Sequence, residues 1–295
     1  MKTLLPYEYD ASQIRGKAKD LVFPKTIGQI GSIIRNNPSI TIRGGGTGLS
    51  GGAIPENTII LDTSKLTKIG KIDTARKTIE VDSGVILDDL NSFLEEYNLE
   101  FPVNPSSYRI CTIGGMIATD AVGSRAIKYG STSKNIRWIE IVNHDGNLEK
   151  KGATEISDYS KMEGTTGVIV KACLNLSSRK KRTASLIPAE NIDQLLELTK
   201  KLKNHGTICA IEFIDDISSE KIGLEKKYHL IAEFEGDEGK LKGEKCDELF
   251  RLRDNLGPIL SKEGHTIVED PKLHSNRIKE FLTWLKIKKI PCFGH

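Results

Sequence analysis

The densest run of glycine in this chain of 295 residues reads Arg43-Gly44-Gly45-Gly46-Thr47-Gly48-Leu49-Ser50-Gly51-Gly52. Six glycines in these ten positions remove the steric penalty on positive φ and let backbone N–H groups converge. Converging amides form a nest that binds a phosphate or a diphosphate. Thr47 and Ser50 add hydroxyl donors, and Arg43 adds a fixed charge at the end of a strand. The stretch therefore predicts an anion-binding loop.

The common nucleotide motifs do not fit this loop. Gly46, Gly48 and Gly51 match GxGxxG, but the dinucleotide-binding fold also requires a helix directly after the glycines. Here Pro55 follows, and then a β-branched strand at 58–62. No Gly-Lys-Ser/Thr closes the loop, so a P-loop is excluded. A flexible surface loop without a ligand is the remaining alternative, and the apolar strands on either side disfavour it.

A second loop runs from Pro102 to Gly115. Its prolines and serines predict a rigid loop with free hydroxyl groups. Thr112 is a suitable N-cap for a short helix whose first turn carries Gly114 and Gly115. Small residues there allow a planar ring or a diphosphate to approach the backbone. The alternative is a tight helix entry with no ligand.

The composition is that of a globular protein, with 38% hydrophobic and 28% charged residues. Lys+Arg total 43 and Asp+Glu total 40, a balance that argues against a nucleic-acid partner or an anionic membrane surface. The basic run at 179–182 is interpreted as a solvated linker. Five separated cysteines without a CxxC pair exclude a zinc knuckle or an iron–sulfur motif, and their odd number disfavours a disulfide framework.

The ends and the apolar stretches of the chain bear on its location. The N-terminus has no apolar signal core, and no apolar stretch approaches the ~20 residues of a membrane-spanning helix. We therefore expect no membrane span and a cytoplasmic protein, with peripheral membrane association left open. The sequence stops at Pro291–His295 in a glycine–histidine loop, so we expect it to be truncated at the C-terminus.

Hydrophobic periodicity divides the chain around residues 177–183, where the composition becomes basic and polar. The first block predicts strands at 39–43, 58–62, 78–82 and 138–142, a helix at 86–97 and an alternating segment at 168–176 that closes it. The second block predicts strands at 184–187, 208–214 and 229–234, and helices at 192–204, 239–256 and about 275–288. That order favours helices on one face of a mostly antiparallel sheet. We therefore predict an α+β fold with domains at 1–178 and 183–295.

Ordered motifs resemble the FAD-linked oxidases of the PCMH (vanillyl-alcohol-oxidase-like) superfamily, in the branch of the glycolate oxidase flavoprotein and D-lactate dehydrogenase. They are RGGGTGLSGGAIP (43–55), PSSYRICTIGGMIATDAVG (105–123), KYGSTSKNI (128–136) and EGTTGVI (163–169). The resemblance covers nearly the whole chain and is tightest over 40–176. It implies a PCMH-type FAD-binding domain of two α+β subdomains, followed by a ferredoxin-like cap or substrate domain that is incomplete here.

The resemblance also implies which residues hold FAD. The glycine loop would hold the diphosphate, and the second loop would line the diphosphate and isoalloxazine side. Ile169 of the EGTTGVI motif would offer backbone contacts to the flavin or the adenine. The implied residues are Arg43, Gly44, Gly45, Gly46, Thr47, Gly48, Ser50, Gly51, Gly52, Pro105, Ser106, Thr112, Gly114, Gly115, Thr119, Glu163 and Ile169. The chain departs from the family at Asp120 and Val122, where Asn and Gly are usual, and at Met162, which replaces a Ser. No histidine lies in either loop, so we expect non-covalent FAD.

On the substrate side, the resemblance implies oxidation of a small D-2-hydroxy acid of the lactate or glycolate type. Such chemistry needs a cation for the carboxylate. Arg253 resembles the arginine of the family's Trp-x-x-Arg, with Phe250 for Trp, and a solvated helix residue is the alternative. Glu212 matches a strand-end acid of the family, although an ordinary edge charge is the favoured interpretation. His295 resembles the first histidine of a metal or substrate-hydroxyl motif, so a divalent-metal site would be incomplete here, since zinc-type sites need three or four ligands.

Other functions remain open for the same motifs. One is a non-redox FAD transferase similar to alkyl-glycerone-phosphate synthase. Another is a FAD-binding fragment or subunit without activity of its own, and a third is a plain nucleotide-phosphate-binding module. For the oxidase, the expected partners are the 2-hydroxy acid and an electron acceptor, which could be an iron–sulfur subunit, a cytochrome, a quinone or oxygen.

Overall fold

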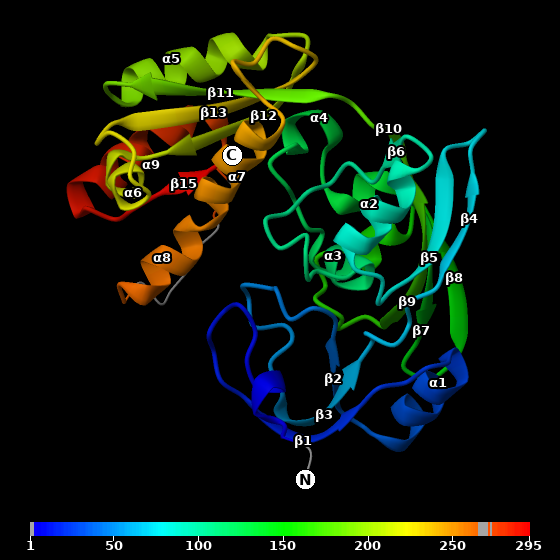
Figure 1. Cartoon of the computed structure of the whole chain (residues 1–295). Helices are drawn as coiled ribbons and strands as arrows, with labels where there is room; N and C mark the ends of the chain where they lie inside the picture. The colour runs from blue at the N-terminus through cyan, green and yellow to red at the C-terminus, as the bar shows by residue number, and fades with distance from the viewer. Residues whose placement is uncertain (1–2, 265–270, 272) are drawn as a thin grey trace. The chain divides into compact units, whose positions relative to one another are not determined.

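The computed structural model describes residues 3–264, 271 and 273–295, and it divides into two compact units (Figure 1). Unit 1 comprises Met1–Gly123 and Tyr129–Arg179, and unit 2 comprises Ser124–Lys128 and Lys180–His295. Both units mix helices with sheets, which confirms the predicted α+β class. The domain limits at 1–178 and 183–295 stay a prediction.

The first sheet of unit 1 is parallel, with the strand order β1-β3-β2. Its strands are β1 (Lys17–Val22), β2 (Ile40–Arg43) and β3 (Glu56–Asp62), and α1 (Ile27–Asn36) connects the first two. The Thr26 side chain accepts a hydrogen bond from the N–H of Gln29 and so caps α1. Ile30 of α1 and Leu61 of β3 are fully buried in one apolar cluster. The glycine loop joins β2 to β3, and it therefore starts at the carboxyl end of β2.

The second sheet of unit 1 is antiparallel, in the order β4-β5-β9-β7-β8. Its strands are β4 (Ile69–Asp73), β5 (Thr78–Asp82), β7 (Ile136–Val142), β8 (Leu148–Gly152) and β9 (Val168–Asn175). Leu90 of α2 (Leu87–Glu95) and Ile117 of α3 (Ile113–Thr119) are fully buried in one core with Ile139 of β7. The end of α2 falls before the predicted residue 97, because Asn98 takes a left-handed conformation with φ 54°.

Short elements complete the first part of the chain. They are η1 (Leu5–Tyr7), β6 (Leu99–Glu100), α4 (Ala126–Tyr129), η2 (Thr132–Asn135), η3 (Ile156–Asp158) and β10 (Ser177–Ser178), which pairs with β6. The interpretation of residues 179–182 as a solvated linker is wrong at its last residue. Arg182 opens β11 with its side chain only 11% exposed, and its Nη2 lies 4.0 Å from Oε1 of Glu235.

The sheet of unit 2 is antiparallel throughout, in the order β14-β11-β13-β12-β15. Its strands are β11 (Arg182–Ala189), β12 (Ile208–Ile214), β13 (Tyr228–Glu235), β14 (Leu241–Lys242) and β15 (Phe293–Gly294). Its helices are α5 (Ile192–Lys203), α6 (Asp216–Lys221), α7 (Glu244–Asp254), α8 (Leu256–Lys262), η4 (Ser275–Arg277) and α9 (Ile278–Lys288). Within the described residues, no helix is long and apolar enough to cross a bilayer.

Helices cover both faces of this sheet, so the prediction of helices on one face is wrong. Leu230 of β13 belongs to an apolar cluster with Leu195 of α5 and Leu282 of α9. The next residue, Ile231, belongs to a separate cluster with Leu249 of α7. Because successive side chains of a strand point to opposite faces, β13 is apolar on both sides and both sides need a cover.

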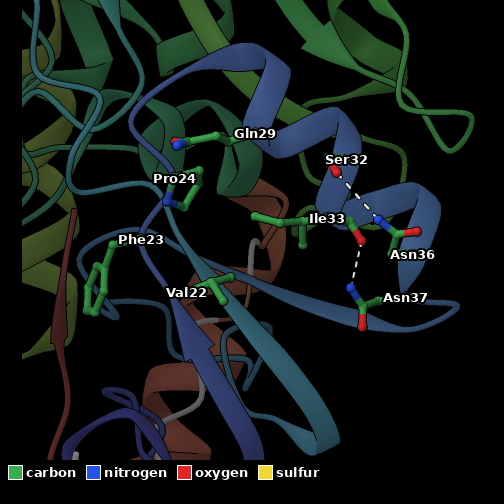
Figure 2. A pocket seen from close by; sticks show the side chains of 8 residues that line it. All are labelled: Val22, Phe23, Pro24, Gln29, Ser32, Ile33, Asn36 and Asn37. Carbon is green, nitrogen blue, oxygen red and sulfur yellow. Dashed lines mark hydrogen bonds between the residues drawn. The ribbon is translucent and has the colours of Figure 1, made fainter.

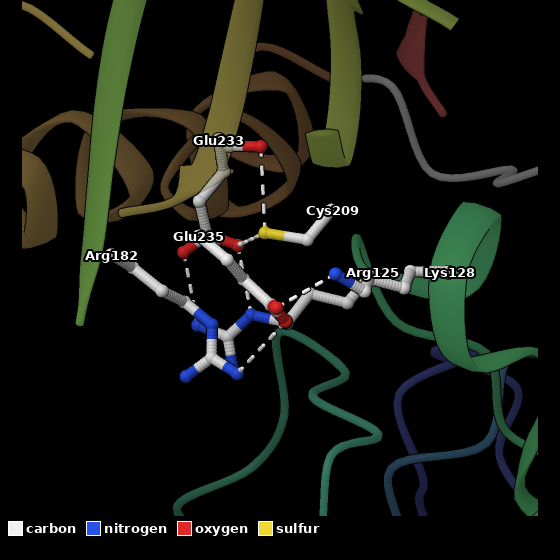
Figure 3. A network of polar contacts seen from close by, with 6 residues as sticks. All are labelled: Arg125, Lys128, Arg182, Cys209, Glu233 and Glu235. Carbon is white, nitrogen blue, oxygen red and sulfur yellow. Dashed lines mark hydrogen bonds and ion pairs between the residues drawn. The ribbon is translucent and has the colours of Figure 1, made fainter. Parts of the chain in front are cut away.

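A network of charged residues lies on the β13 strand of unit 2 (Figure 3). Glu233, 2% exposed, accepts hydrogen bonds from Nε and Nη2 of Arg125 at 2.8 and 3.0 Å, and one from the thiol of Cys209. Lys128 lies 2.7 Å from Glu235 on the same strand. Since a buried carboxylate needs compensating charge, these contacts explain why the segment Ser124–Lys128 packs with unit 2.

Candidate functional site

The glycine loop of unit 1 packs directly on the chain that leads into α3. A Cβ atom added to Gly44 would lie 2.3 Å from Oγ1 of Thr112, and one added to Gly45 would lie 2.2 Å from the carbonyl oxygen of Ile110. Only Gly46 and Gly51 in this loop have positive φ, at 64° and 80°. Gly44 and Gly45 are therefore required by the close approach of the two loops, and Gly46 and Gly51 by their left-handed backbone.

The amide groups of the glycine loop are available to a ligand. Within the described residues, the N–H groups of residues 45–52 donate to no other group of the protein. Several neighbouring carbonyl groups are used: that of Gly46 accepts from Ala11 at 3.0 Å, and that of Gly51 accepts from Ile54 at 3.0 Å. The loop is thus fixed through its acceptors while its donors stay open. A run of open amides on a fixed loop suits an anion with several oxygen atoms.

Arg43 contacts the glycine loop with its guanidinium. Its side chain is largely buried, Nη1 donates to the carbonyl of Ala53 at 3.5 Å, and the guanidinium lies over the ring of Tyr7. Burial lowers the pKa of Arg43, and the nearby carboxylates of Asp62 and Asp10 oppose that shift. A Cβ on Gly46 would collide with this guanidinium at 2.2 Å. Arg43 therefore places a positive charge beside Gly46 of the loop.

The start of α3 uses the predicted cap. Oγ1 of Thr112 accepts from the N–H of Gly115 at 3.3 Å, which confirms the predicted N-cap geometry. The N–H of Gly114 donates to the carbonyl of Ser83 at 2.7 Å, and the Thr119 hydroxyl donates to the carbonyl of Gly115 at 3.0 Å. The small size of Gly114 therefore serves packing against Ser83, and its N–H is already used.

The EGTTGVI motif (163–169) contacts the glycine loop through Glu163. A Cβ on Gly52 would lie 2.2 Å from Oε2 of Glu163, and the N–H of Glu163 donates to the carbonyl of Ala118 of α3 at 3.0 Å. Glu163 thus touches both the glycine loop and the helix that follows the second loop. Ile169 lies in β9 with its side chain in the unit core, so only its backbone remains for a ligand.

Two predicted cofactor residues are not brought to this cluster by any contact in the described part of the chain. Pro105 is buried and its carbonyl accepts from Tyr108 at 3.0 Å, whereas Ser106 is exposed. The structure instead adds Ser83 and Ile110 to the cluster, and neither was predicted. Ser83 lies on a different strand end and Ile110 contributes only a carbonyl, so neither gives a residue-type pattern in the sequence.

Asp120, the departure from the family pattern, ends α3 in a left-handed conformation with φ 50°. It accepts a hydrogen bond from the N–H of Ser133 at 2.9 Å, and Nζ of Lys161 lies 3.5 Å away. Burial works to raise the pKa of Asp120, but the hydrogen bonds from Ser133 and Ser131 and the charge of Lys161 together lower it. Asp120 is therefore a charged brace between α3 and the following loop.

The predicted substrate-side residues come together in unit 2. Nε and Nη2 of Arg253 lie 2.8 and 2.7 Å from the same oxygen, Oε2, of Glu212. Nδ1 of His295 lies 3.4 Å from the other oxygen, Oε1. The ring of Phe293 lies against the guanidinium, with its centroid 5.2 Å from Cζ. Pairing of β15 with β12 brings residues 293–295 beside Glu212, so Glu212 is the centre of the cluster and the edge-charge interpretation is wrong.

A metal does not fit this cluster. No group of three or more His, Cys, Asp or Glu side chains that could hold a metal ion is found among the described residues. Glu212 and His295 would supply only two of the three or four ligands that a zinc-type site needs. The incomplete metal site predicted at His295 therefore gains no support.

Two pockets of unit 1 lie away from these clusters. One, of about 390 Å³, lies between the end of β1 and α1 and is shown in Figure 2. Its polar groups bond to each other or to backbone: the Asn37 side chain donates to the carbonyl of Ile33 and that of Asn36 to Ser32. The other, of about 470 Å³, is lined by residues of β4, β5, β7 and β9. Neither is lined by a residue of the glycine loop.

Known proteins match this chain as follows. A family model described as "FAD binding domain" matches residues 18–152. The D-lactate dehydrogenase of Archaeoglobus fulgidus is 31% identical over 81% of this chain, and the chain spans 58% of that protein's length. The D-lactate dehydrogenase of Anaerostipes hadrus is 30% identical over 98% of this chain and 74% of its own length. A solved structure of alkyldihydroxyacetonephosphate synthase shares the fold, with a TM-score of 0.64 at 18% identity over 90% of this chain and 57% of that one.

Proposed function

Because this chain belongs to the PCMH-type FAD-linked oxidases, in the branch of the D-lactate dehydrogenases, we propose that it oxidises a D-2-hydroxy acid with FAD. When bound, FAD supplies the acceptor for the hydride that leaves the α-carbon of the acid. Turnover then needs an electron acceptor, and we propose a partner protein or quinone for this step. The substrate is proposed to be of the lactate or glycolate type.

The observation that carries the cofactor part is the run of open amides at residues 45–52. Eight backbone N–H donors close to the charge of Arg43 suit a diphosphate, and Thr47 and Ser50 add hydroxyl groups. We propose that the FAD is held without a covalent bond. Cys111 is the cysteine of the second loop, and burial raises the pKa of its thiol to about 11, so it stays protonated and a poor nucleophile.

The substrate part is supported by the shared contacts of Glu212. Arg253 would hold the carboxylate of the acid through hydrogen bonds from its guanidinium. His295 would accept the proton of the hydroxyl group at Nε2, because its Nδ1 faces the Glu212 carboxylate. Both side chains contact the same buried carboxylate, so the anchor and the base would be neighbours.

The test is the visible absorbance spectrum of the purified chain loaded with FAD, before and after anaerobic addition of D-lactate or glycolate. We expect a flavin spectrum that bleaches on addition of the acid. Arg253→Met should keep the flavin spectrum while kcat/KM falls about 10- to 150-fold, the range for a lost hydrogen bond to a charged group. Glu248→Gln on the same helix, at an exposed position, serves as the matched control.

Two other functions give different results in this test. The likeness in fold to alkyldihydroxyacetonephosphate synthase favours a non-redox FAD transferase, for which the flavin would stay oxidised with every hydroxy acid. A FAD-binding portion without activity of its own would bind flavin but show no bleaching with any hydroxy acid. Absence of flavin after addition of FAD would contradict all three functions.

A further inference from the structure

We propose that Glu212 is a positioning residue, which orients the guanidinium of Arg253 so that its terminal nitrogens face the carboxylate of the substrate. This inference rests on the proposed function, because it takes Arg253 as the carboxylate anchor. It adds a role for Glu212 that concerns the geometry of the anchor and not the reacting atoms.

The hydrogen bonds of Arg253 show which donors remain for a ligand. A guanidinium carries five N–H donors in a fixed planar arrangement. Glu212 accepts a hydrogen bond from Nε at 2.8 Å, its same oxygen lies 2.7 Å from Nη2 as an ion pair, and Asp254 accepts one donor of Nη1 at 3.3 Å. At least one N–H therefore remains on each terminal nitrogen. Two such donors at the end of the guanidinium can hold a carboxylate through both of its oxygens.

The burial of the two partners shows which one is fixed. The side chain of Glu212 is 0% exposed on β12, next to the central strand β13, whereas that of Arg253 is 13% exposed on α7. The strand therefore fixes the carboxylate, and the carboxylate fixes one edge of the guanidinium. The ring of Phe293 supports the guanidinium from its face. With one edge and one face of the guanidinium held, its remaining terminal N–H groups are the donors left for a ligand.

The contacts of Glu212 are asymmetric in a way that fits this role. Nε and Nη2 of Arg253 both contact Oε2, at 2.8 and 2.7 Å, while Oε1 makes no hydrogen bond among the described residues. A pair that served only to neutralise buried charge would gain more from one donor on each oxygen. In the observed geometry one edge of the guanidinium contacts Oε2 alone. The other oxygen, Oε1, lies 3.4 Å from Nδ1 of His295.

Orientation and charge make opposite predictions for substitutions at Glu212. If Glu212 acts through its charge, it weakens the binding of an anion, and removing the charge should tighten that binding. If it acts through orientation, removing the acceptor should weaken binding, and an amide oxygen in its place should restore part of it. Glu212→Leu removes the acceptor, and Glu212→Gln keeps an acceptor without the charge.

The experiment is isothermal titration calorimetry of the full chain, loaded with FAD, with oxalate as the carboxylate probe. We expect the unsubstituted chain to bind oxalate, Glu212→Leu to bind at least about tenfold more weakly, and Glu212→Gln to lie between the two. In an Arg253→Met background, Glu212→Leu should cause no further loss, because a positioning residue acts through its partner. That double variant replaces the pair with apolar side chains and is expected to fold.

Two results would overturn the assignment. One is oxalate binding by Glu212→Leu that equals or exceeds that of the unsubstituted chain, and the other is no oxalate binding by the unsubstituted chain. The proposed function is judged separately by bleaching of the flavin with D-lactate or glycolate. Bleaching together with an unaffected Glu212→Leu variant keeps the function and removes the inference. A tenfold loss without bleaching by any hydroxy acid keeps the inference and removes the function.

Discussion

The glycine loop of unit 1 and the Glu212 cluster of unit 2 build their binding groups from different parts of the chain. The loop offers backbone amides from eight consecutive residues, 45–52. The cluster offers side chains from β12, α7 and the segment after β15, which are far apart in sequence. The loop depends on the absence of side chains at a few positions, and the cluster depends on the correct pairing of a whole sheet. The two sites should therefore fail in different ways.

The largest effect is expected from breaking the charged network that supports the sheet of unit 2. Glu233→Ala would remove the buried carboxylate that accepts two hydrogen bonds from Arg125, and it should lower the free energy of unfolding of unit 2 by about 3–5 kcal/mol. Urea denaturation followed by circular dichroism measures it, with the exposed Glu248→Ala as control. If Glu233→Ala lowers the free energy of unfolding no more than the control does, the stability of unit 2 does not depend on the ion pair of Glu233 with Arg125.

A smaller effect is expected from a single methyl group in the loop of unit 1. Gly45→Ala would place a Cβ 2.2 Å from the carbonyl oxygen of Ile110, and overpacking of this kind costs about 1–3 kcal/mol. The variant should also lose FAD on gel filtration, as read from the absorbance of the flavin.

The matched control is Gly28→Ala in α1 of the same unit, where an added Cβ meets nothing within 4 Å. That variant should keep its FAD and gain about 0.5–1 kcal/mol, because alanine is the better helix former. Equal flavin content in the two variants would show that the loop tolerates side chains. The contrast with unit 2 would then be lost.

The smallest effect concerns pH. Burial lowers the pKa of His229, which is 4% exposed on β13 and accepts or donates a hydrogen bond with Ser219 at 2.9 Å. Because the folded-state pKa lies below the unfolded value near 6.5, the stability from neutral His229 is present above pH 6.5. It is lost as the pH falls through the lowered value. Urea midpoints at pH 7.5 and pH 5.5 should differ less in His229→Gln than in the unsubstituted chain.

The control for this comparison is His144→Gln in unit 1, where the imidazole is 89% exposed. We expect it to change the urea midpoint little at either pH, because a substitution at an exposed side chain usually costs little stability. If it flattens the dependence as much as His229→Gln, the acid sensitivity does not belong to unit 2.

Sequence alone determined the features that depend on neighbours in the chain. The glycine loop after β2, the Thr112 cap and the alternating strands all follow from short-range rules for backbone conformation and side-chain spacing. The resemblance to the FAD-linked oxidases rests on the same local motifs, which is why the family match over residues 18–152 agrees with it.

Only the tertiary structure decided which distant groups meet. Sequence gave no reason to place Ile110 beneath Gly45, or Glu163 against Gly52, because those contacts depend on how two loops pack. The same holds for the helices on both faces of β13 and for Glu212, whose partners lie on a helix and at the end of β15. A charged side chain at a strand end has the same local pattern whether it faces solvent or a buried guanidinium, and only the pairing of β12 with β15 and the packing of α7 distinguish the two.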